Sequence, residues 1–276
     1  MTVIAVTSAR GAPGVTTTAL VLTLAWPRPV LLVEADVCGS SSIKAGHLRG
    51  EYDHQLSLIN LALAHRSGGL NLDTLRGQTI SLTADRGRLV LPGLATRAQA
   101  ASLTESFWAS LATLLKAVAG HGVDVIVDAG RLGMRHGPDP LLRTADLLAV
   151  VCRTGLDDLV AVRANADQLP GTDADAVVER HGLVLVGDGR PHRASEAAGA
   201  TTLPVWASIA WDPLTAERVN GRERVRTSLA RLGNSRLIRS GRAAIAELAD
   251  VDGRRRQVLG QPTHRAATHI AGGVGA

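Results

Sequence analysis

The sequence predicts an α/β protein with three layers, in which helices cover both faces of a doubly wound, mostly parallel sheet of about seven strands. Short apolar runs alternate along the chain with longer segments of helical periodicity, which is the pattern of repeated β–α units. Hydrophobic residues make up 45% of the chain but aromatic residues only 2%. The core must therefore consist of Val, Leu, Ile and Ala, as buried parallel strands do.

The predicted elements follow from apolar runs and from their polar ends. A first strand is expected to begin at residue 3, and further strands over residues 30–33, 88–92, 123–130, 146–152, 183–186 and 204–209. Helices are expected over 15–26, 56–65, 99–118, 157–169 and within 215–250. Phe107 and Trp108 are expected in the core. Residues 38–53 are expected to form a surface loop, and residues 67–86 have no clear pattern. Residues 1–250 are thus predicted to form one domain, followed by a disordered tail over 251–276.

The first predicted strand runs into a loop and a helix, with the sequence VIAVTSARGAPGVTTT over residues 3–18. Such a turn gathers backbone N–H groups at a helix N-terminus, which suits a phosphate. The usual phosphate loop reads GxxxxGK[ST]. In that frame Ala9 stands at the first glycine, Gly14 at the second, Val15 at the lysine and Thr16 at the hydroxyl. The loop therefore keeps the geometry of a nucleotide site and lacks its main cation.

Carboxylates follow two other predicted strands. Glu34 and Asp36 end the second strand, and Asp128 ends the strand over 123–130. Ligands of open α/β sheets bind at the carboxyl ends of the strands, so these acids are candidate ligand residues. An acid in the position of Asp128 binds Mg²⁺ in phosphate-loop proteins. The alternative for Asp36 is an ordinary capping role at the start of a βα loop.

The net charge is +5, and arginine carries nearly all of the positive charge because Lys44 and Lys116 are the only lysines. This balance admits an acidic partner such as nucleic acid or a membrane surface, but a GC-rich genome gives the same arginine bias. The region 215–250 is rich in arginines that form either a solvated helix face or a footprint for phosphate backbones. They are Arg218, Arg222, Arg224, Arg226, Arg231, Arg236, Arg239 and Arg242.

Cysteine usage and hydropathy indicate a cytoplasmic protein. Cys38 and Cys152 have no metal-ligand spacing and are expected to be reduced thiols. No signal peptide precedes Val3, and no uncharged apolar run reaches the roughly 18 residues of a membrane span. An apolar stripe near the C-terminus is expected to pack on the sheet, and membrane binding through it is the minor alternative. The stripe consists of Leu237, Ile238, Ile245 and Leu248.

Taken together, these segments resemble the MinD/ParA family of deviant phosphate-loop ATPases over roughly residues 1–250. The resemblance rests on RGAPGVTT, EAD, LPG, VDVIVDAG and ADLLAVVCRTGLDDLVAVR. Among the family, the chain is most similar in style to the atypical TadZ- and CpaE-like members, which position pilus and secretion machinery. The family's loop reads KGGxGKTT, so Arg10 occupies the position of the signature lysine that reaches across a nucleotide-sandwich dimer.

The resemblance also implies roles for individual residues. Asp36 would position the attacking water if the protein hydrolyses ATP, and Thr16, Asp36 and Asp128 would hold Mg²⁺. The segment from Gly187 to Arg190 lacks the family's adenine-contacting asparagine, whereas the later loop at Trp211 resembles the one that closes on the base. The implied nucleotide-binding residues are Arg10, Gly11, Ala12, Pro13, Gly14, Val15, Thr16, Thr17, Trp211, Asp212 and Pro213.

The function implied by the resemblance is that of a degenerate ATP-binding protein with weak or absent hydrolysis, because fixed positive charge at the transferring phosphoryl group is missing. Such a protein would act as a homodimeric positioning or scaffolding factor for pilus, secretion or cell-division machinery, with ATP and Mg²⁺ as cofactors. Its protein partner would belong to the positioned machine, at a pole, the septum or the nucleoid. The alternative is a chromosome or plasmid partition protein that binds nonspecific DNA through its C-terminal arginines.

Overall fold

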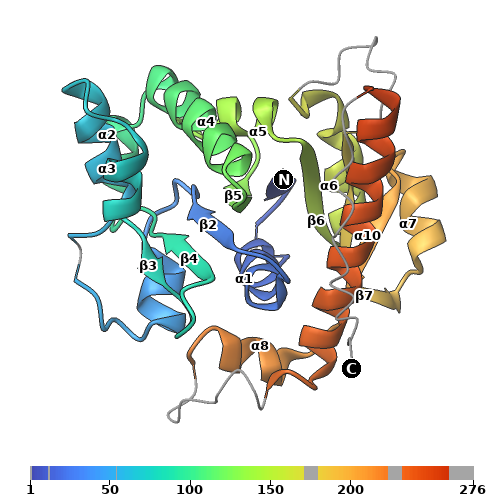
Figure 1. The fold of residues 1–276 in the computed structure, drawn as a ribbon. Coiled ribbons are helices and arrows are strands. Elements are labelled where there is room, and N and C mark those ends of the chain that lie inside the picture. The colour runs from blue at the N-terminus through green and yellow to red at the C-terminus, as the bar shows by residue number, and fades with distance from the viewer. Residues whose placement is uncertain (1, 12, 54, 171–179, 223–231, 261–276) are drawn as a thin grey trace, which may run out of the picture.

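An eight-stranded sheet forms the middle layer of the computed structural model (Figure 1). The structure describes residues 2–11, 13–53, 55–170, 180–222 and 232–260. The strand order is β3-β4-β2-β5-β1-β6-β7-β8, and only β3 pairs with its neighbour in an antiparallel manner. The predicted doubly wound, mostly parallel sheet with helices on both faces is therefore confirmed. The eighth strand is β3, which lies in the segment without a sequence pattern.

The elements have the following bounds. The strands are β1 (Val3–Ser8), β2 (Val30–Glu34), β3 (Ile80–Ser81), β4 (Arg88–Leu91), β5 (Asp124–Arg131), β6 (Leu147–Thr154), β7 (His181–Pro191) and β8 (Val205–Ile209). The helices are α1 (Val15–Ala25), α2 (Leu58–Arg66), α3 (Leu72–Gly77), α4 (Glu105–Gly120), α5 (Asp139–Thr144), α6 (Leu156–Ala164), α7 (Ala194–Thr201), α8 (Pro213–Val219) and α10 (Arg236–Val258). Short helical turns η1 (Ile43–His47), η2 (Arg97–Ser102) and η3 (Ala166–Gln168) complete the set.

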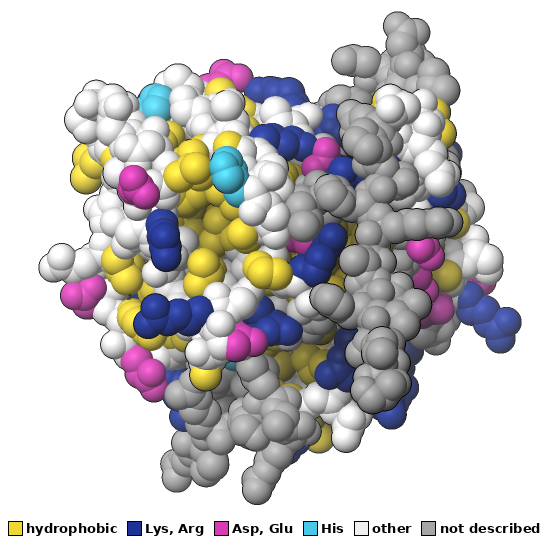
Figure 2. All heavy atoms as spheres, in the orientation of Figure 1, with side chains coloured by type: hydrophobic (Ala, Val, Ile, Leu, Met, Phe, Trp, Pro, Cys, Tyr) yellow, Lys and Arg dark blue, Asp and Glu magenta, His cyan; other side chains and the backbone are white. Residues whose placement is uncertain are grey.

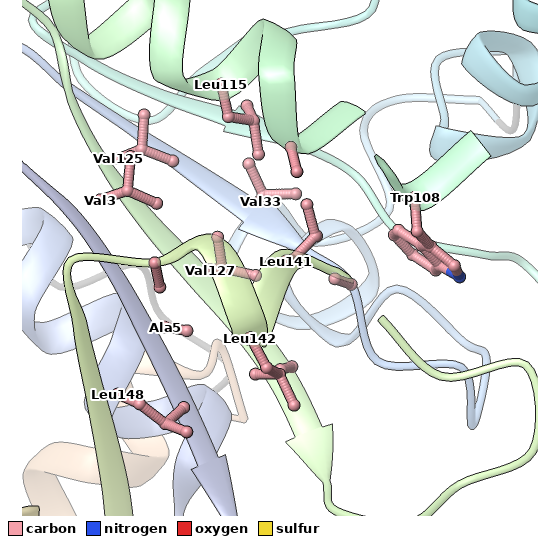
Figure 3. Packing of buried hydrophobic residues seen from close by; sticks show 14 of the residues in the cluster. Val3, Ala5, Val33, Trp108, Leu115, Val125, Val127, Leu141, Leu142 and Leu148 are labelled. Atoms are coloured by element: carbon pink, nitrogen blue, oxygen red, sulfur yellow. The ribbon is translucent and has the colours of Figure 1, made fainter. Parts of the chain in front are cut away.

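Alternate residues of the central strands point to opposite faces of the sheet, so the core has two halves. Figure 3 shows one half, in which Val3, Val33 and Val127 of the strands lie near Leu115 of α4 and Leu141 of α5. Phe107 and Trp108 of α4 belong to this half, and each side chain is buried, as predicted. Burial of each such side chain contributes about 1.5–3 kcal/mol. The small aliphatic strand residues thus allow α4 to pack closely on the sheet.

The other half of the core lies between the sheet and the helices α1, α8 and α10. Helix α10 packs against β8 and α1, and Gly241 makes this approach close: a Cβ there would lie 2.7 Å from Cγ1 of Val21. The apolar stripe of α10 is buried in this contact, as expected from its spacing. Its members are Leu237, Ile238, Ile245 and Leu248. Within the described ranges, no helix is both long enough and apolar enough to cross a membrane.

Several boundaries differ from the sequence predictions. Strand β7 runs from His181 to Pro191 and so continues past the predicted end at Val186, and α6 ends at Ala164, before the predicted end at Leu169. The helix expected over 99–118 is two elements, because η2 ends at Ser102 and Thr104 then caps α4 by accepting a hydrogen bond from the Phe107 N–H at 3.2 Å. The surface loop expected over 38–53 contains η1, whose Ile43 is buried. Helix α10 continues past Asp250 to Val258 and buries Val251, so the tail predicted from residue 251 is wrong for this helical part. Residues 261–276 lie outside the described residues.

Candidate nucleotide-binding cleft

The carboxyl ends of the central strands form one edge of the sheet, and the predicted site residues lie along it. The loop between β1 and α1 is built around Gly14, whose φ of +110° suits only glycine without strain. Its carbonyl accepts a hydrogen bond from the Thr18 N–H at 2.8 Å and so starts α1. A Cβ added at Gly11 or Gly14 would meet no atom within 4 Å. The backbone of this loop therefore faces open space, as a phosphate cradle requires.

A cleft of about 770 Å³ opens beside this loop. Its volume is within the range of ligand sites, which is about 300–1,000 Å³. Ten of the predicted site residues line it: Gly11, Pro13, Gly14, Val15, Thr16, Thr17, Asp36, Trp211, Asp212 and Pro213. Ala12 lies outside the described residues. The structure therefore brings together segments that are up to about 200 residues apart in the chain, as expected where parallel strands end at the same edge.

A small hollow of about 20 Å³ adjoins the cleft and is lined by Thr16, Glu34, Asp36 and Asp128. This space holds about one water-sized particle. Asp128 is buried, and burial raises its pKa to about 7, although the Thr16 hydroxyl and the Gly130 N–H donate hydrogen bonds to it. Glu34 and Asp36 raise the pKa of Asp128 further through charge repulsion. A divalent cation in the hollow would relieve this repulsion.

The donors around the hollow are hydroxyl and carboxylate oxygens, which suit Mg²⁺. No group of three or more His, Cys, Asp and Glu side chains in the described part of the chain has the arrangement of a metal site. Mg²⁺ commonly keeps several waters and uses one or two carboxylates together with substrate phosphates, so it needs no closed cage. The donor set therefore fits Mg²⁺ held by Thr16, Asp128 and Asp36 with a bound phosphate.

The two acids of β2 and its loop have different environments. Glu34 accepts hydrogen bonds from the Ser41 hydroxyl, the Ile43 N–H at 3.0 Å and the Gly93 N–H at 3.2 Å. Burial raises the pKa of Glu34. This carboxylate thus anchors the loop after β2 to the end of β4.

Asp36 lines both the cleft and the hollow, and one of its oxygens accepts a hydrogen bond from the Cys38 N–H at 2.9 Å. Asp36 therefore stabilises a local Asx turn and faces the cleft, but it does not cap a helix, because the next helical turn, η1, has Ser42 at its N-cap. Cys38 is exposed and Cys152 is buried, and neither forms a disulfide. Burial also raises the pKa of the Cys152 thiol to about 12.

Arg10 is the predicted residue that the structure places elsewhere. Its guanidinium pairs with Asp157 and lies 3.8 Å from Asp158, both in the first turn of α6. The hydrogen bond from Arg10 lowers the pKa of Asp157. Arg10 is absent from the described residues that line the cleft. In this conformation, therefore, the Arg10 guanidinium pairs with the start of α6 and does not line the cleft.

The segment after β8 lines a further part of the cleft, here called the Trp211 end. Asp212 caps α8 by accepting hydrogen bonds from the N–H of Thr215 at 3.1 Å and from its hydroxyl at 2.7 Å. Asn220 ends α8 and donates to the Thr17 hydroxyl at 3.0 Å, which joins α8 to α1. The Trp211 side chain is 39% exposed, and the Arg153 guanidinium lies 4.9 Å from its ring centroid. This end offers an aromatic surface on which a base could stack.

Among the described residues, four arginines line the cleft that the sequence analysis did not assign to it, namely Arg97, Arg131, Arg153 and Arg222. Of these, Arg222 was expected only as part of the arginine-rich region 215–250. Two of them had a detectable signal. Arg131 follows VDAG and Arg153 follows VVC, so each stands at the carboxyl end of a predicted strand, where ligands bind. Arg97 had none, because its position depends on how η2 packs against the loop after β2.

Comparison with known proteins identifies the architecture. No family model matches the sequence, and no curated protein matches it either. Among solved structures, the cell division ATPase MinD of Pyrococcus furiosus has a TM-score of 0.68 and 19% identity, over 91% of this chain and 99% of that one. The chain has the fold of the MinD and ParA ATPases.

Two further structures support this identification of the fold. The septum site-determining protein MinD of Pyrococcus horikoshii, in complex with Mg-ADP, has a TM-score of 0.67 and 18% identity, over 92% of this chain and 98% of that one. A ParA family ATPase of Chlorobium tepidum has a TM-score of 0.66 and 15% identity, over 88% of this chain and 98% of that one. The MinD/ParA-like fold thus extends over nearly the whole described chain.

Proposed function

We propose that this chain binds ATP with Mg²⁺ in the cleft and acts as a dimeric spatial-positioning or scaffolding factor of the MinD/ParA kind, with weak or absent ATP hydrolysis. The observation that carries the proposal is the open loop around Gly14 between a 770 Å³ cleft and the buried acid Asp128. Backbone N–H groups at the start of α1 bind the phosphates, and the Thr16 hydroxyl with Asp128 and Asp36 holds Mg²⁺.

The residues that line the cleft support one direction for the nucleotide. Thr16, Asp36 and Asp128 would hold Mg²⁺, which would neutralise charge on the outer phosphates, so these phosphates would lie beside the three residues. The base would then lie toward Trp211. This direction agrees with the role that the resemblance implies for the loop Trp211–Pro213.

Weak hydrolysis follows from the charges in the loop. Val15 stands where a lysine would stabilise the transferring phosphoryl group, and its side chain is only 7% exposed. Loss of one such group typically lowers the rate by a factor of about 10²–10³. Arg10 is paired with Asp157 and does not replace it. Asp36 remains in place to position a water molecule if slow hydrolysis occurs.

Structural relatives of several kinds support the positioning role. They include the MinC:MinD cell division complex of Aquifex aeolicus, an McdA variant of Cyanothece in complex with ATP, and a putative plasmid partition protein of Borrelia burgdorferi bound to AMPPNP. We propose that this chain likewise forms a homodimer and contacts a protein of the machine that it positions. Recruitment to a pole, the septum or the nucleoid, and a role at pili or secretion machinery, belong to the same proposal.

Millimolar ATP with Mg²⁺ should stabilise the protein against thermal unfolding. A ligand that binds only the folded state adds about 2.7 kcal/mol at 100 times its dissociation constant. Differential scanning fluorimetry with and without EDTA measures the shift. Thr16→Val keeps the side-chain shape but removes the hydroxyl, so it should reduce the Mg²⁺-dependent part of the shift.

Two results would contradict this proposal in different ways. Absence of any shift at millimolar nucleotide would reject nucleotide binding and leave only a scaffold. Turnover at the rate of an ordinary ATPase, abolished by Asp36→Ala, would reject weak hydrolysis but would support nucleotide binding in the cleft.

A second candidate function is partition through nonspecific DNA binding, supported by exposed arginines on the outer face of α10. Arg236, Arg239 and Arg242 lie there, while the opposite face of the helix is buried. Arg224, Arg226 and Arg231 lie outside the described residues. On the face shown in Figure 2, basic side chains are scattered among acidic and hydrophobic ones.

If the DNA-binding candidate is correct, affinity for nonspecific duplex should fall steeply with salt. Three phosphate contacts by α10 give a slope of log K against log salt concentration of about −2.7. Fluorescence anisotropy over a salt series measures it, and the variant with Gln at 236, 239 and 242 should lose most of the slope. Arg76→Gln, at an exposed position on α3, serves as the control. Absent or salt-independent binding would remove this candidate.

A further inference from the structure

Neither lysine of the chain replaces the cation that the phosphate loop lacks. Lys44 donates hydrogen bonds to the carbonyls of Asp53 at 2.8 Å and Leu56 at 3.1 Å. Lys116 pairs with Asp146 at 2.6 Å. Positive charge in the cleft must therefore come from arginine, and the described residues that line the cleft include four arginines. Arg153 lies against Trp211 at the base end, and Arg222 follows α8.

Arg131 lies where β5 ends beside the start of the phosphate loop. Its Cα is paired in register with Ser8, the last residue of β1. The backbone is fixed on both sides of Arg131: the Thr7 hydroxyl donates to the Gly130 carbonyl at 3.1 Å, and the Leu132 N–H donates to the Ser8 carbonyl at 2.9 Å. The position from which the Arg131 side chain enters the cleft is thus set by β1.

Arg97 begins η2 on the other side of the Asp36 loop. The backbone of Gly39 lies so close that an added Cβ would be 2.5 Å from the Arg97 nitrogen. The Ser40 N–H donates to the Ala95 carbonyl at 3.2 Å, which fixes the two segments together. Arg97 and Arg131 both act electrostatically on the Cys38 thiol and lower its pKa, against the larger effect of burial, which raises it. Both cations therefore lie near the Asp36 end of the cleft.

Both guanidinium groups are available to a ligand. Within the described ranges, no hydrogen bond or ion pair engages either of them, whereas Arg10, Arg28 and Arg143 are paired with carboxylates. Both residues are exposed and line the cleft. Two unpaired cations beside the Mg²⁺ hollow place positive charge where the outer phosphates of a nucleotide would lie.

We infer that Arg97 and Arg131 hold the outer phosphates of the nucleotide and so supply, for binding, the positive charge that the loop lacks at Val15. The inference rests on the proposed nucleotide binding and adds the residues that select a triphosphate. Arginine has a planar fork that bonds phosphate oxygens in pairs, which favours tight holding of the phosphates. Because the two side chains lie at the outer-phosphate end, they strengthen ATP binding and leave AMP binding unchanged.

Isothermal titration with Mg-ATP and with AMP tests this inference on the full chain. Arg97→Ala and Arg131→Ala should each lower the affinity for ATP by at least about tenfold, as expected for loss of a hydrogen bond to a charged group. The affinity for AMP should stay within about twofold, and Arg131→Lys should retain part of the ATP affinity because the charge remains. Arg135→Ala is the matched control, since Arg135 is exposed in the same loop but does not line the cleft.

The outcomes separate this inference from the proposal on which it rests. If the unmodified chain binds ATP and both alanine variants bind it equally well, the inference is wrong and nucleotide binding stands. An equal loss of ATP and AMP affinity would also reject it, because the side chains would then act on the whole cleft. If the unmodified chain binds neither nucleotide, both ideas are overturned. Thermal unfolding of each variant without ligand shows that it is folded.

Discussion

Asp128→Asn should stabilise the nucleotide-free protein at pH 8 by roughly 2–4 kcal/mol. The pKa of Asp128 is raised from 3.8 to about 7 in the folded protein, so folding favours the protonated acid. The stability that this protonated acid contributes is fully present below pH 3.8 and is lost as the pH rises through about 7. Asparagine keeps an oxygen that can accept from Thr16 and Gly130, and it has no charge to bury. The advantage of the variant should therefore shrink as the pH falls and vanish near pH 4, which urea unfolding over a pH series measures.

Asp124→Asn is the matched control, because Asp124 is also a buried aspartate of β5. Its carboxylate pairs with Arg28 at 2.8 Å and accepts from the Trp26 indole N–H at 2.8 Å and the Thr2 N–H at 2.9 Å. Removing this charge leaves the Arg28 guanidinium without its partner, so the variant should be less stable at pH 8. If the two substitutions change the free energy of unfolding at pH 8 in opposite directions, the charge of Asp124 stabilises the fold and that of Asp128 does not. This result would indicate that the Asp128 carboxylate serves ligand binding. A destabilised Asp128→Asn protein at pH 8 would contradict this account.

The same substitution should remove the Mg²⁺-dependent thermal shift with ATP. Asparagine offers a neutral oxygen in place of a charged one, so it attracts the cation less. A protein that gains stability and loses ligand binding at one residue shows the usual opposition between stability and function at a site.

The sequence was sufficient to predict the layers of the fold because strand and helix alternate with clear periods. It also predicted that Thr16, Asp36 and Asp128 lie together, and they line one hollow because the carboxyl ends of parallel strands meet at one edge of the sheet. The sequence pattern does not predict β3, because two residues are too few to show a periodicity and their pairing with β4 depends on the rest of the sheet. It also predicts too early an end for α10, because the arginines after Gly253 interrupt the apolar periodicity of the helix.

The charges of the cleft were less predictable than its backbone. The pairing of Arg10 with Asp157 joins residues 147 positions apart, and only the neighbouring positions of β1 and β6 bring them together. Arg97 reaches the cleft because β4 lies beside β2 in the sheet. A long arginine side chain can also reach several partners, and the local sequence does not show with which of them it pairs. The arginines that line the cleft come from several elements that are far apart in the sequence, so no single motif predicts them.

Gly130→Ala should move the Asp36 carboxylate away from the outer-phosphate end of the cleft. Gly130 has a φ of +62°, and a Cβ there would lie 2.4 Å from Cγ of Asp36. Gly133 is the matched control because its φ is +70° and a Cβ there meets no atom within 4 Å. Both alanine variants should lose about 1–2 kcal/mol of stability from the left-handed backbone. Only Gly130→Ala should also weaken Mg-ATP binding, because only there is the acid displaced.

A double-mutant cycle distinguishes this contact from a general loosening of the loop. Asp36→Ala removes the carboxylate that would clash with the Cβ introduced by Gly130→Ala. The double variant should therefore lose less stability than the sum of the losses in the two single variants. Neighbours in contact typically show a coupling of about 0.5–3 kcal/mol. The pair Gly133→Ala and Asp36→Ala should be additive. Additivity in both pairs would mean that the Asp36 side chain can change its rotamer at no energetic cost. Gly130 would then be required only for its backbone conformation.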